Sequence, residues 1–189
     1  MAASSSSSSA AARTTHALGK EHELRLEVGA DGEAGFVQLL RGTAELFGVE
    51  LAEGRAYALP PGRSAALFSW HGCELAVWGG AQNVYTADDG AAPLWAALHQ
   101  RLEARREEAR LGGGWGPRVA VVGPTDAGKS SLCRVLAAYA ARCGRAVTVV
   151  DTDVGQVRAL AAAAAAAAAQ SSAVRTRAAP SFIIIIDLI

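Results

Sequence analysis

The residues best suited to chemistry form one short run, Gly123-Pro-Thr-Asp-Ala-Gly-Lys-Ser130, with the spacing G-x-x-x-x-G-K-S. Glycines at the two ends of such a loop let the backbone curl, so that successive N–H groups point at one anionic group. Lys129 would place its charge on the β- and γ-phosphates of a nucleotide, and the Ser130 hydroxyl could ligate Mg²⁺. The run therefore predicts a phosphate-binding loop.

The segments beside this loop should place it between a strand and a helix. Residues 118–122 are a short apolar, β-branched run, which is typical of a buried parallel strand. Apolar residues recur at helical spacing through residues 131–143, and Gly144 supplies a stop. Because the helix would begin at the loop, its N-terminal partial charge also favours an anion there.

A second buried-strand pattern, residues 146–150, leads into Asp151 and Asp153. A strand–helix–strand unit of this length predicts a parallel sheet, and ligands bind at the carboxyl ends of such strands. One carboxylate could hold a Mg²⁺ water and the other could accept the proton of an attacking hydroxyl; a turn with an Asp cap is the alternative. Acids this soon after the loop favour phosphoryl transfer to an alcohol. A GTPase would need an N-K-x-D segment, which the sequence lacks.

Residues 21–87 are predicted to form a small all-β sandwich. Short stretches of apolar–polar alternation are separated by Gly, Asp and Pro, which is typical of strands joined by turns. The expected strands are 23–28, 36–40, 43–47, 65–70, 74–78 and 83–86. His71 and Gly72 should form a hairpin turn, and Trp70 and Trp78 should fill the core.

Residues 88–116 should form a linking helix followed by a glycine linker. Asp88 or Asp89 could cap its start, and Gly112–Gly114 should end it. Charges of both signs over residues 101–110 indicate a solvated face; an RNA-facing basic stripe is the alternative. Residues 1–20 are rich in Ser and Ala and are predicted to be disordered, with an organellar transit peptide as the alternative.

Composition argues against several other classes of protein. The formal net charge is zero, so no global field attracts nucleic acid or an anionic membrane. No apolar run approaches the ~18–20 residues of a membrane span. The three cysteines lack C-x-x-C spacing and the four histidines are scattered, which predicts a reducing compartment and no metal site.

Several segments resemble the polyribonucleotide 5′-hydroxyl kinase family, the nuclear ATP-binding subunit of pre-mRNA cleavage and polyadenylation factor. The clearest are Trp70–Cys73, Gly116–Val119, Val122–Ser130 and Asp153–Gln156, within a resemblance that covers about residues 20–156. This resemblance implies an N-terminal β-sandwich, a P-loop domain and a C-terminal domain. It also implies ATP with Mg²⁺, γ-phosphate transfer to an RNA 5′-hydroxyl end, nuclear localisation, and other cleavage-factor subunits and tRNA-splicing endonuclease as partners.

The resemblance also implies roles for individual residues. Glu23 matches a family contact to the adenosine part of ATP, whereas a family lysine contact falls near Ser64. Asp153 matches an acid that serves as general base or Mg²⁺ partner, so the implied catalytic pair is Lys129 with Asp153 and the implied metal ligands are Ser130 with Asp153. The implied nucleotide-binding residues are Glu23, Gly123, Asp126, Ala127, Gly128, Lys129, Ser130 and Ser131.

After Gln156 the sequence departs from the family. Residues 117–156 would be the start of a P-loop kinase domain, and residues 157–189, with nine consecutive alanines, an unrelated low-complexity tail. The predicted fold is an α+β two-part chain: an all-β sandwich, then an incomplete P-loop α/β (βαβ) unit on two strands, with disordered termini. The resemblance implies that relatives continue with a lid whose arginines stabilise charge on the transferred phosphoryl group. Without these arginines the chain alone should be a poor kinase. A non-catalytic ATP-holding scaffold is the alternative.

Overall fold

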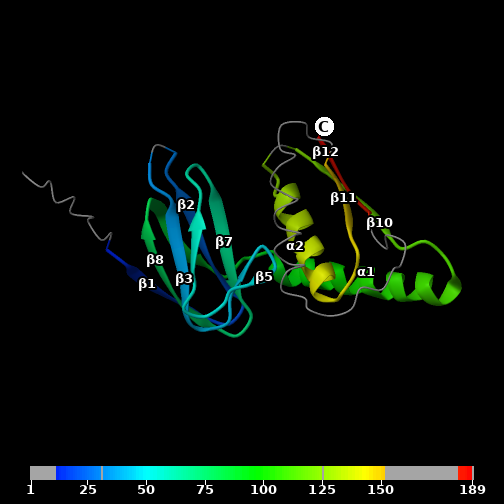
Figure 1. The fold of residues 1–189 in the computed structure, drawn as a ribbon, viewed down its shortest axis with the longest axis horizontal. Helices are drawn as coiled ribbons and strands as arrows, with labels where there is room; N and C mark the ends of the chain where they lie inside the picture. The colour runs from blue at the N-terminus through cyan, green and yellow to red at the C-terminus, as the bar shows by residue number, and fades with distance from the viewer. Residues whose placement is uncertain (1–11, 31, 125, 152–182, 189) are drawn as a thin grey trace, which may run out of the picture. The chain divides into compact units, whose positions relative to one another are not determined.

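The computed structural model describes residues 12–30, 32–124, 126–151 and 183–188 (Figure 1). These residues divide into two compact units, one formed by residues up to 44 with 51–90 and the other by 45–50 with 91 onward. The predicted fold class, a β-sandwich followed by a P-loop α/β unit, is confirmed. The domain boundaries that we drew from the sequence stay a prediction, as do the poly-alanine segment and Asp153, which lie outside the described residues.

Two antiparallel sheets make up the first unit. One has the order β1-β8-β3-β6, and its strands are β1 (Thr14–Leu18), β3 (Gly35–Gly42), β6 (Ala56–Leu59) and β8 (Cys73–Gly79). In the other, β2 (His22–Val28) pairs with β7 (Ser64–Ser69) on one side and with β9 (Ala81–Ala87) on the other. The apolar positions of the alternating strands face inward, and the fully buried side chains there include Leu24, Leu26, Val37, Leu39, Leu67 and Leu75.

The sequence predictions missed parts of this sandwich. Thr14–Leu18 pairs with β8 as strand β1, so the prediction that residues 1–20 are disordered is wrong for this segment. Strand β6 was not predicted. The expected strand 43–47 is reduced to the two residues Glu45 and Leu46 of β4.

His71 and Gly72 do not form the predicted hairpin, because β7 and β8 belong to different sheets. They form instead a crossing from one sheet to the other. The buried Ser69 hydroxyl holds this crossing: it donates to the Thr43 carbonyl at 2.6 Å and accepts from the Gly72 N–H at 2.9 Å. Trp78 is half-buried rather than central, and its ring stacks on Phe36 with centroids 5.5 Å apart.

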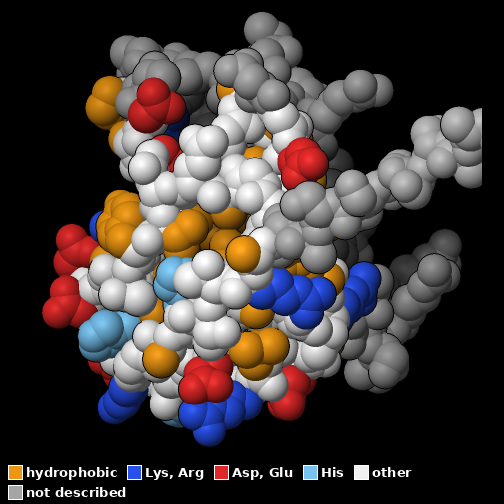
Figure 2. All heavy atoms as spheres, turned by 90° about the vertical axis from the view of Figure 1, so that its left-hand side faces the viewer, with side chains coloured by type: hydrophobic (Ala, Val, Ile, Leu, Met, Phe, Trp, Pro, Cys, Tyr) orange, Lys and Arg blue, Asp and Glu red, His pale blue; other side chains and the backbone are white. Residues whose placement is uncertain are grey.

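Figure 2 views the molecule from the side on which β1 and β8 lie in Figure 1. Apolar, basic, acidic and histidine side chains are intermixed on this face, and neither sign of charge dominates. This agrees with a formal net charge of zero. Attraction of a nucleic acid by a broad basic surface is therefore not favoured on this side.

The second unit contains two helices and a parallel sheet. Its elements are α1 (Ala92–Gly112), β10 (Arg118–Gly123), α2 (Lys129–Arg142), β11 (Thr148–Asp151) and β12 (Ile183–Leu188), together with the short antiparallel pair β4 (Glu45–Leu46) and β5 (Val49–Glu50). The sheet order is β10-β12-β11, with β12 parallel to both neighbours. The prediction of a two-stranded sheet was therefore wrong, because a segment that we assigned to an unrelated tail supplies the middle strand.

Helix α2 carries the apolar core of this unit. Cys133, Leu136 and Ala137 are buried together with Leu102 of α1. Half-buried valines of the strands, among them Val119 and Val149, pack against this cluster. The helix starts directly after the loop and ends before Gly144, whose φ of +70° is the left-handed conformation that favours glycine at a helix end.

The ends of α1 were predicted with mixed success. Gly113 ends the helix in the left-handed conformation, as expected. The predicted Asp caps were wrong, because the helix begins at Ala92 and its N-cap residue Ala91 makes no side-chain capping bond. Asp89 instead accepts a hydrogen bond from Arg25 at 2.7 Å within the first unit.

The charged stretch of α1 is not simply a solvated face. Arg106 is only 3% exposed and His99 only 9% exposed. Arg106 pairs with Glu103, and Arg145, which follows α2, donates to the other oxygen of Glu103 at 2.8 Å. The prediction of a solvated face was therefore wrong for this part of the helix, where a small charged cluster is shielded from water.

We expect His99 to make stability depend on pH. Burial lowers the pKa of His99 despite a smaller opposing effect of the Glu103 carboxylate. Between the folded and unfolded pKa values of His99, the unfolded chain binds more protons than the folded chain. The contribution of neutral His99 to the free energy of unfolding should therefore be fully present above about pH 6.5 and decrease as the pH falls toward the folded pKa. Urea unfolding across this range should show a weaker pH dependence in His99→Gln. An unchanged pH dependence, equal to that of the exposed-site control His71→Gln, would contradict the assignment.

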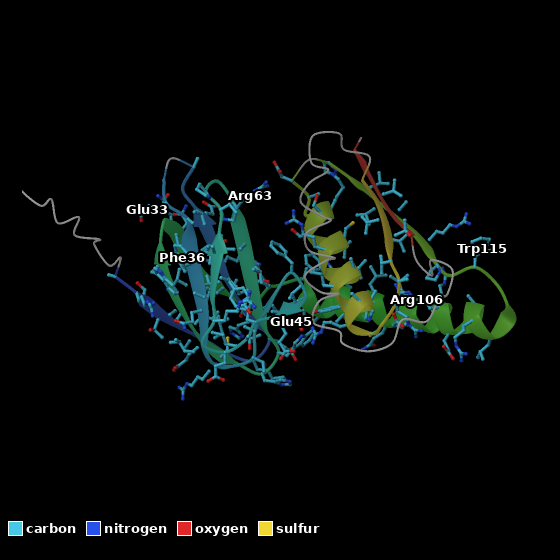
Figure 3. All side chains as sticks on the ribbon, viewed as in Figure 1. Glu33, Phe36, Glu45, Arg63, Arg106 and Trp115 are labelled. Carbon is cyan, nitrogen blue, oxygen red and sulfur yellow. The ribbon has the colours of Figure 1, made fainter. Side chains whose placement is uncertain are left out.

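The β4–β5 turn is fixed to α2 by a polar contact (Figure 3, which labels Glu45). Glu45 is 8% exposed. It accepts a hydrogen bond from the Tyr139 hydroxyl at 2.8 Å and another from Arg142 at 2.7 Å. Gly48, at a φ of +78°, lies against Val135 and Tyr139, where a Cβ would come within 3.2 Å of both.

Candidate nucleotide-binding site

The predicted phosphate loop lies between the end of β10 at Gly123 and the start of α2 at Lys129. Gly128 is the N-cap of α2 and has φ +79°, a conformation that side-chain-bearing residues rarely adopt. Asp126 also has positive φ, at 62°. Gly123 does not, so among the two motif glycines only Gly128 is required by backbone geometry in this structure.

Lys129 is held across the loop by main-chain oxygens. Its Nζ donates to the carbonyl of Gly123 at 2.6 Å and to the carbonyl of Pro124 at 2.7 Å. The ammonium group therefore stays at the loop, where a phosphate could take over its hydrogen bonds. The role of the Pro124 carbonyl was not predicted, because a main-chain acceptor leaves no signal in the side-chain pattern.

Ser130 and Ser131 occupy the first turn of α2 and are half-buried. The first N–H groups of a helix have no partner within the helix, and its partial positive charge lies at the same end. The Ser130 hydroxyl, beside Lys129, is an oxygen donor of the kind that Mg²⁺ accepts. The residues present therefore fit a nucleotide phosphate with Mg²⁺.

Asp126 and Ala127 form the exposed outer part of the loop. The Ala127 N–H donates to the Pro124 carbonyl at 3.3 Å, a long hydrogen bond. Such a bond is easily exchanged for one to a ligand oxygen. The loop thus offers N–H groups and one ammonium group to a ligand, and the Ala127 N–H is only weakly hydrogen-bonded within the protein.

Asp151 ends strand β11, and Gly123 ends strand β10. Both strands run parallel to β12, where Asp151 is in register with Ile186 and Gly123 with Leu188. The carboxyl ends of β10 and β11 therefore reach the same edge of the sheet. This is the edge at which the sequence predicted an acid beside the phosphate loop, and Asp151 is the described residue there.

Glu23, the predicted adenosine contact, lies in the first unit, whereas the phosphate loop lies in the second. It is 7% exposed and accepts a hydrogen bond from Arg25 at 2.5 Å. This hydrogen bond raises the pKa of Arg25. Gly90 lies so close that a Cβ there would come within 2.6 Å of a Glu23 oxygen, so a side chain at this position would have to displace the Glu23 carboxylate. Ser64 begins β7 and is exposed.

Two sequence-family models match the chain. The N-terminal β-sandwich domain of polyadenylation factor matches residues 17–109, and the P-loop of mRNA cleavage and polyadenylation factor CLP1 matches residues 123–180. The chain belongs to the CLP1 family. The second match extends beyond Gln156, where we expected the family resemblance to end.

Curated CLP1 relatives support the assignment. The chain is 46% identical over 144 residues to polyribonucleotide 5′-hydroxyl-kinase Clp1 of Xenopus tropicalis and 43% identical over 143 residues to the human protein of the same name. The matched segment is 76% of this chain in both cases, and 32% and 33% of the relatives. The matched part of the chain thus spans about a third of the length of these CLP1 proteins.

Solved CLP1 structures show the same fold. A structure of the interface between Pcf11p and Clp1p, which addresses ATP loss in a point mutant, has a TM-score of 0.65 at 22% identity and covers 77% of this chain and 34% of that one. A wild-type Clp1p–Pcf11p complex has a TM-score of 0.63 at 23% identity, with coverage of 74% and 32%. Among the described residues of our CLP1 chain, no helix is long and apolar enough to cross a bilayer.

Proposed function

We propose that this chain is the ATP-binding part of a subunit of the mRNA 3′-end cleavage and polyadenylation machinery, with polynucleotide 5′-hydroxyl kinase chemistry. The observation that carries the proposal is the loop from Gly123 to Ser130, built between a parallel strand and a helix in a CLP1-family chain. The name of the relatives, polyribonucleotide 5′-hydroxyl-kinase Clp1, supports the reaction class.

Binding of ATP would use the groups that the loop brings together. The N–H groups at the start of α2 would donate to the phosphate oxygens, and Lys129 would exchange the Gly123 and Pro124 carbonyls for the β- and γ-phosphates. Ser130 would hold Mg²⁺, which in such sites neutralises charge on the phosphates. Glu23 would contact the adenosine part, as the family resemblance implies.

The reaction would transfer the γ-phosphoryl group to the 5′-hydroxyl end of an RNA. The 5′-oxygen forms a bond to the γ-phosphorus, the bond to the β–γ bridging oxygen breaks, and ADP leaves. A carboxylate takes the proton of the attacking hydroxyl. We assign this role to Asp153, which the family resemblance implies, with Asp151 at the sheet edge as the second acid.

The setting of this activity follows from the family. Other cleavage-factor subunits are the proposed partners, supported by solved complexes in which a related Clp1p binds Pcf11p. Location in the nucleus and association with tRNA-splicing endonuclease are further proposals, which rest on the family resemblance alone.

A non-catalytic ATP-holding scaffold is the competing function. The loop residues alone can retain a nucleotide, and a ligand that binds only the folded state stabilises that state by mass action. One solved relative is described both by the interface between Pcf11p and Clp1p and by the loss of ATP in a point mutant. This pairing of bound ATP with a partner interface supports the scaffold alternative.

Transfer of labelled γ-phosphate from ATP to a 5′-hydroxyl RNA tests the proposal. We expect the present chain to retain ATP with little transfer, and a form extended through the family's lid and C-terminal domain to transfer phosphate. A 5′-phosphorylated RNA is the matched control, because it has no hydroxyl to accept the group. If the extended form binds ATP and never transfers it, the kinase assignment is wrong and the scaffold assignment stands.

A further inference from the structure

Three side chains with metal-binding atoms meet where α1 passes the C-terminal end of α2. His99 and Glu103 lie one turn apart on α1, and Cys143 is the C-cap residue of α2. The His99 Nε2 lies 3.7 Å from the Cys143 Sγ and 4.0 Å from a Glu103 oxygen. The donor atoms of all three lie within 4.8 Å of one another.

These separations are close to those of a zinc site. Zinc binds His nitrogen and carboxylate oxygen at about 2.0–2.2 Å and thiolate sulfur at about 2.3 Å, so ligand atoms in a tetrahedral site lie roughly 3.3–3.6 Å apart. Donor atoms that lie within 4.8 Å of one another would have to approach by about 1 Å to reach this geometry. Imidazole and thiolate favour zinc over magnesium or calcium, which prefer oxygen ligands.

His99 is in a suitable state to be a ligand. Its ring packs edge-on against Tyr139 with centroids 5.5 Å apart, which fixes its orientation. The Nε2 atom faces Cys143, while the buried Nδ1 atom has no hydrogen-bond partner among the described residues.

Glu103 accepts hydrogen bonds from two arginines, as a metal-binding carboxylate accepts hydrogen bonds from the residues that orient it. Arg145 donates to one Glu103 oxygen at 2.8 Å, and Arg106 donates to the other. An ionised carboxylate has about four lone-pair positions, so it can bind a metal while it accepts these hydrogen bonds. Such outer contacts orient ligating carboxylates.

Charge around the cluster sets a limit on the affinity. The two arginines oppose the approach of a dication. The carboxylate, a thiolate at Cys143 and the partial negative charge at the C-terminus of α2 offset them. The Cys143 side chain is exposed, which leaves a coordination position open to water.

We propose that His99, Glu103 and Cys143 bind one zinc ion, which fastens the C-terminal end of α2 to α1. The site is at the opposite end of α2 from Lys129 and shares no residue with the phosphate loop. The proposal therefore does not depend on the proposed kinase or scaffold function. The sequence analysis predicted no site of this kind, because the histidines are scattered and the cysteines lack C-x-x-C spacing.

Cobalt(II) and zinc titrations of the full chain test the site, in a reducing buffer free of thiols. We expect one metal per chain, a sulfur-to-cobalt charge-transfer band, and a higher melting temperature with zinc. Cys143→Ser should abolish the band and weaken zinc binding by at least about tenfold, as should His99→Asn. His71→Asn, at an exposed histidine, is the matched control and should bind like the unchanged chain.

The outcomes separate a built site from chance binding. Cys143 is exposed, so Cys143→Ser should fold normally, and circular dichroism of the variant without metal checks this. If the unchanged chain binds no zinc, or if Cys143→Ser binds zinc as tightly and gives the same cobalt band, the proposal is overturned and any metal is an adventitious ion only. Retained binding in His99→Asn would also remove His99 from the ligand set.

Discussion

Lys129→Ala is expected to weaken ATP binding by about 10²–10³-fold. The lysine would contribute charge-assisted hydrogen bonds to two phosphates, each worth about 1.5–3 kcal/mol. Two bonds near the lower end of this range give roughly 3–4 kcal/mol, which corresponds to the expected loss of affinity. In the free protein its ammonium group already lies at the loop, bound to the Gly123 and Pro124 carbonyls. Isothermal titration with ATP in the presence of Mg²⁺ measures the change.

The sequence offers a matched control for this variant. Lys20 is the only other lysine in the sequence, and its side chain is 71% exposed in the first unit. Lys20→Ala removes the same charge and should leave ATP binding unchanged. The free energy of unfolding without nucleotide should change by less than about 0.5 kcal/mol in Lys20→Ala, as is usual for surface substitutions. Equal ATP affinity in Lys129→Ala and Lys20→Ala would refute the assignment of the phosphate loop.

Glu45→Ala is expected to lower the free energy of unfolding by about 2–3 kcal/mol. The substitution leaves the Tyr139 hydroxyl and Arg142 without their buried acceptor, and a lost hydrogen bond to a charged group costs about 1.5–3 kcal/mol. A fully buried ion pair would cost more, but the Arg142 side chain is 38% exposed and can turn to water. Urea unfolding of the full chain, followed by tryptophan fluorescence and circular dichroism, gives the value.

Glu50→Ala is the control for this experiment. Glu50 also pairs with Arg142, at 3.4 Å, but its side chain is 53% exposed. Such surface pairs contribute about 0–1 kcal/mol. If Glu45→Ala costs no more than Glu50→Ala, the contact between the β4–β5 turn and α2 does not stabilise the second unit.

The nucleotide-binding loop was predictable because its signal is local. The spacing of Gly123, Gly128 and Lys129, with an apolar run before it and a helical pattern after it, depends on residues that are neighbours in the chain. The left-handed Gly128 and the helix start at Lys129 follow directly from this pattern. The strands β2, β3, β7, β8 and β9 were predictable for the same reason, because alternation within a few residues shows which side faces the core.

The failed predictions depend on partners that are distant in sequence. Asp89 was predicted to cap a helix because it lies just before the helical pattern, but it accepts a hydrogen bond from Arg25, 64 residues earlier. The sequence pattern of α1 predicted a solvated charged face, because it does not show that Arg145, 42 residues after Glu103, donates a hydrogen bond to Glu103. Alternation predicted the strands on both sides of His71 but could not show that they belong to different sheets.

The path of the chain between the two units has a consequence for how the protein can be divided and how it folds. The six residues 45–50 belong to the second unit, although the segments before and after them belong to the first, so the backbone passes between the units three times. A single cleavage near Gly90 would thus separate α2 from Glu45, its partner 94 residues earlier. Contacts of such long separation form slowly, because closing the intervening loop costs entropy before the contact stabilises anything. The second unit is therefore expected to complete its folding only after the first 50 residues are in place, and a fragment that begins at residue 91 should be less stable than the same residues within the whole chain.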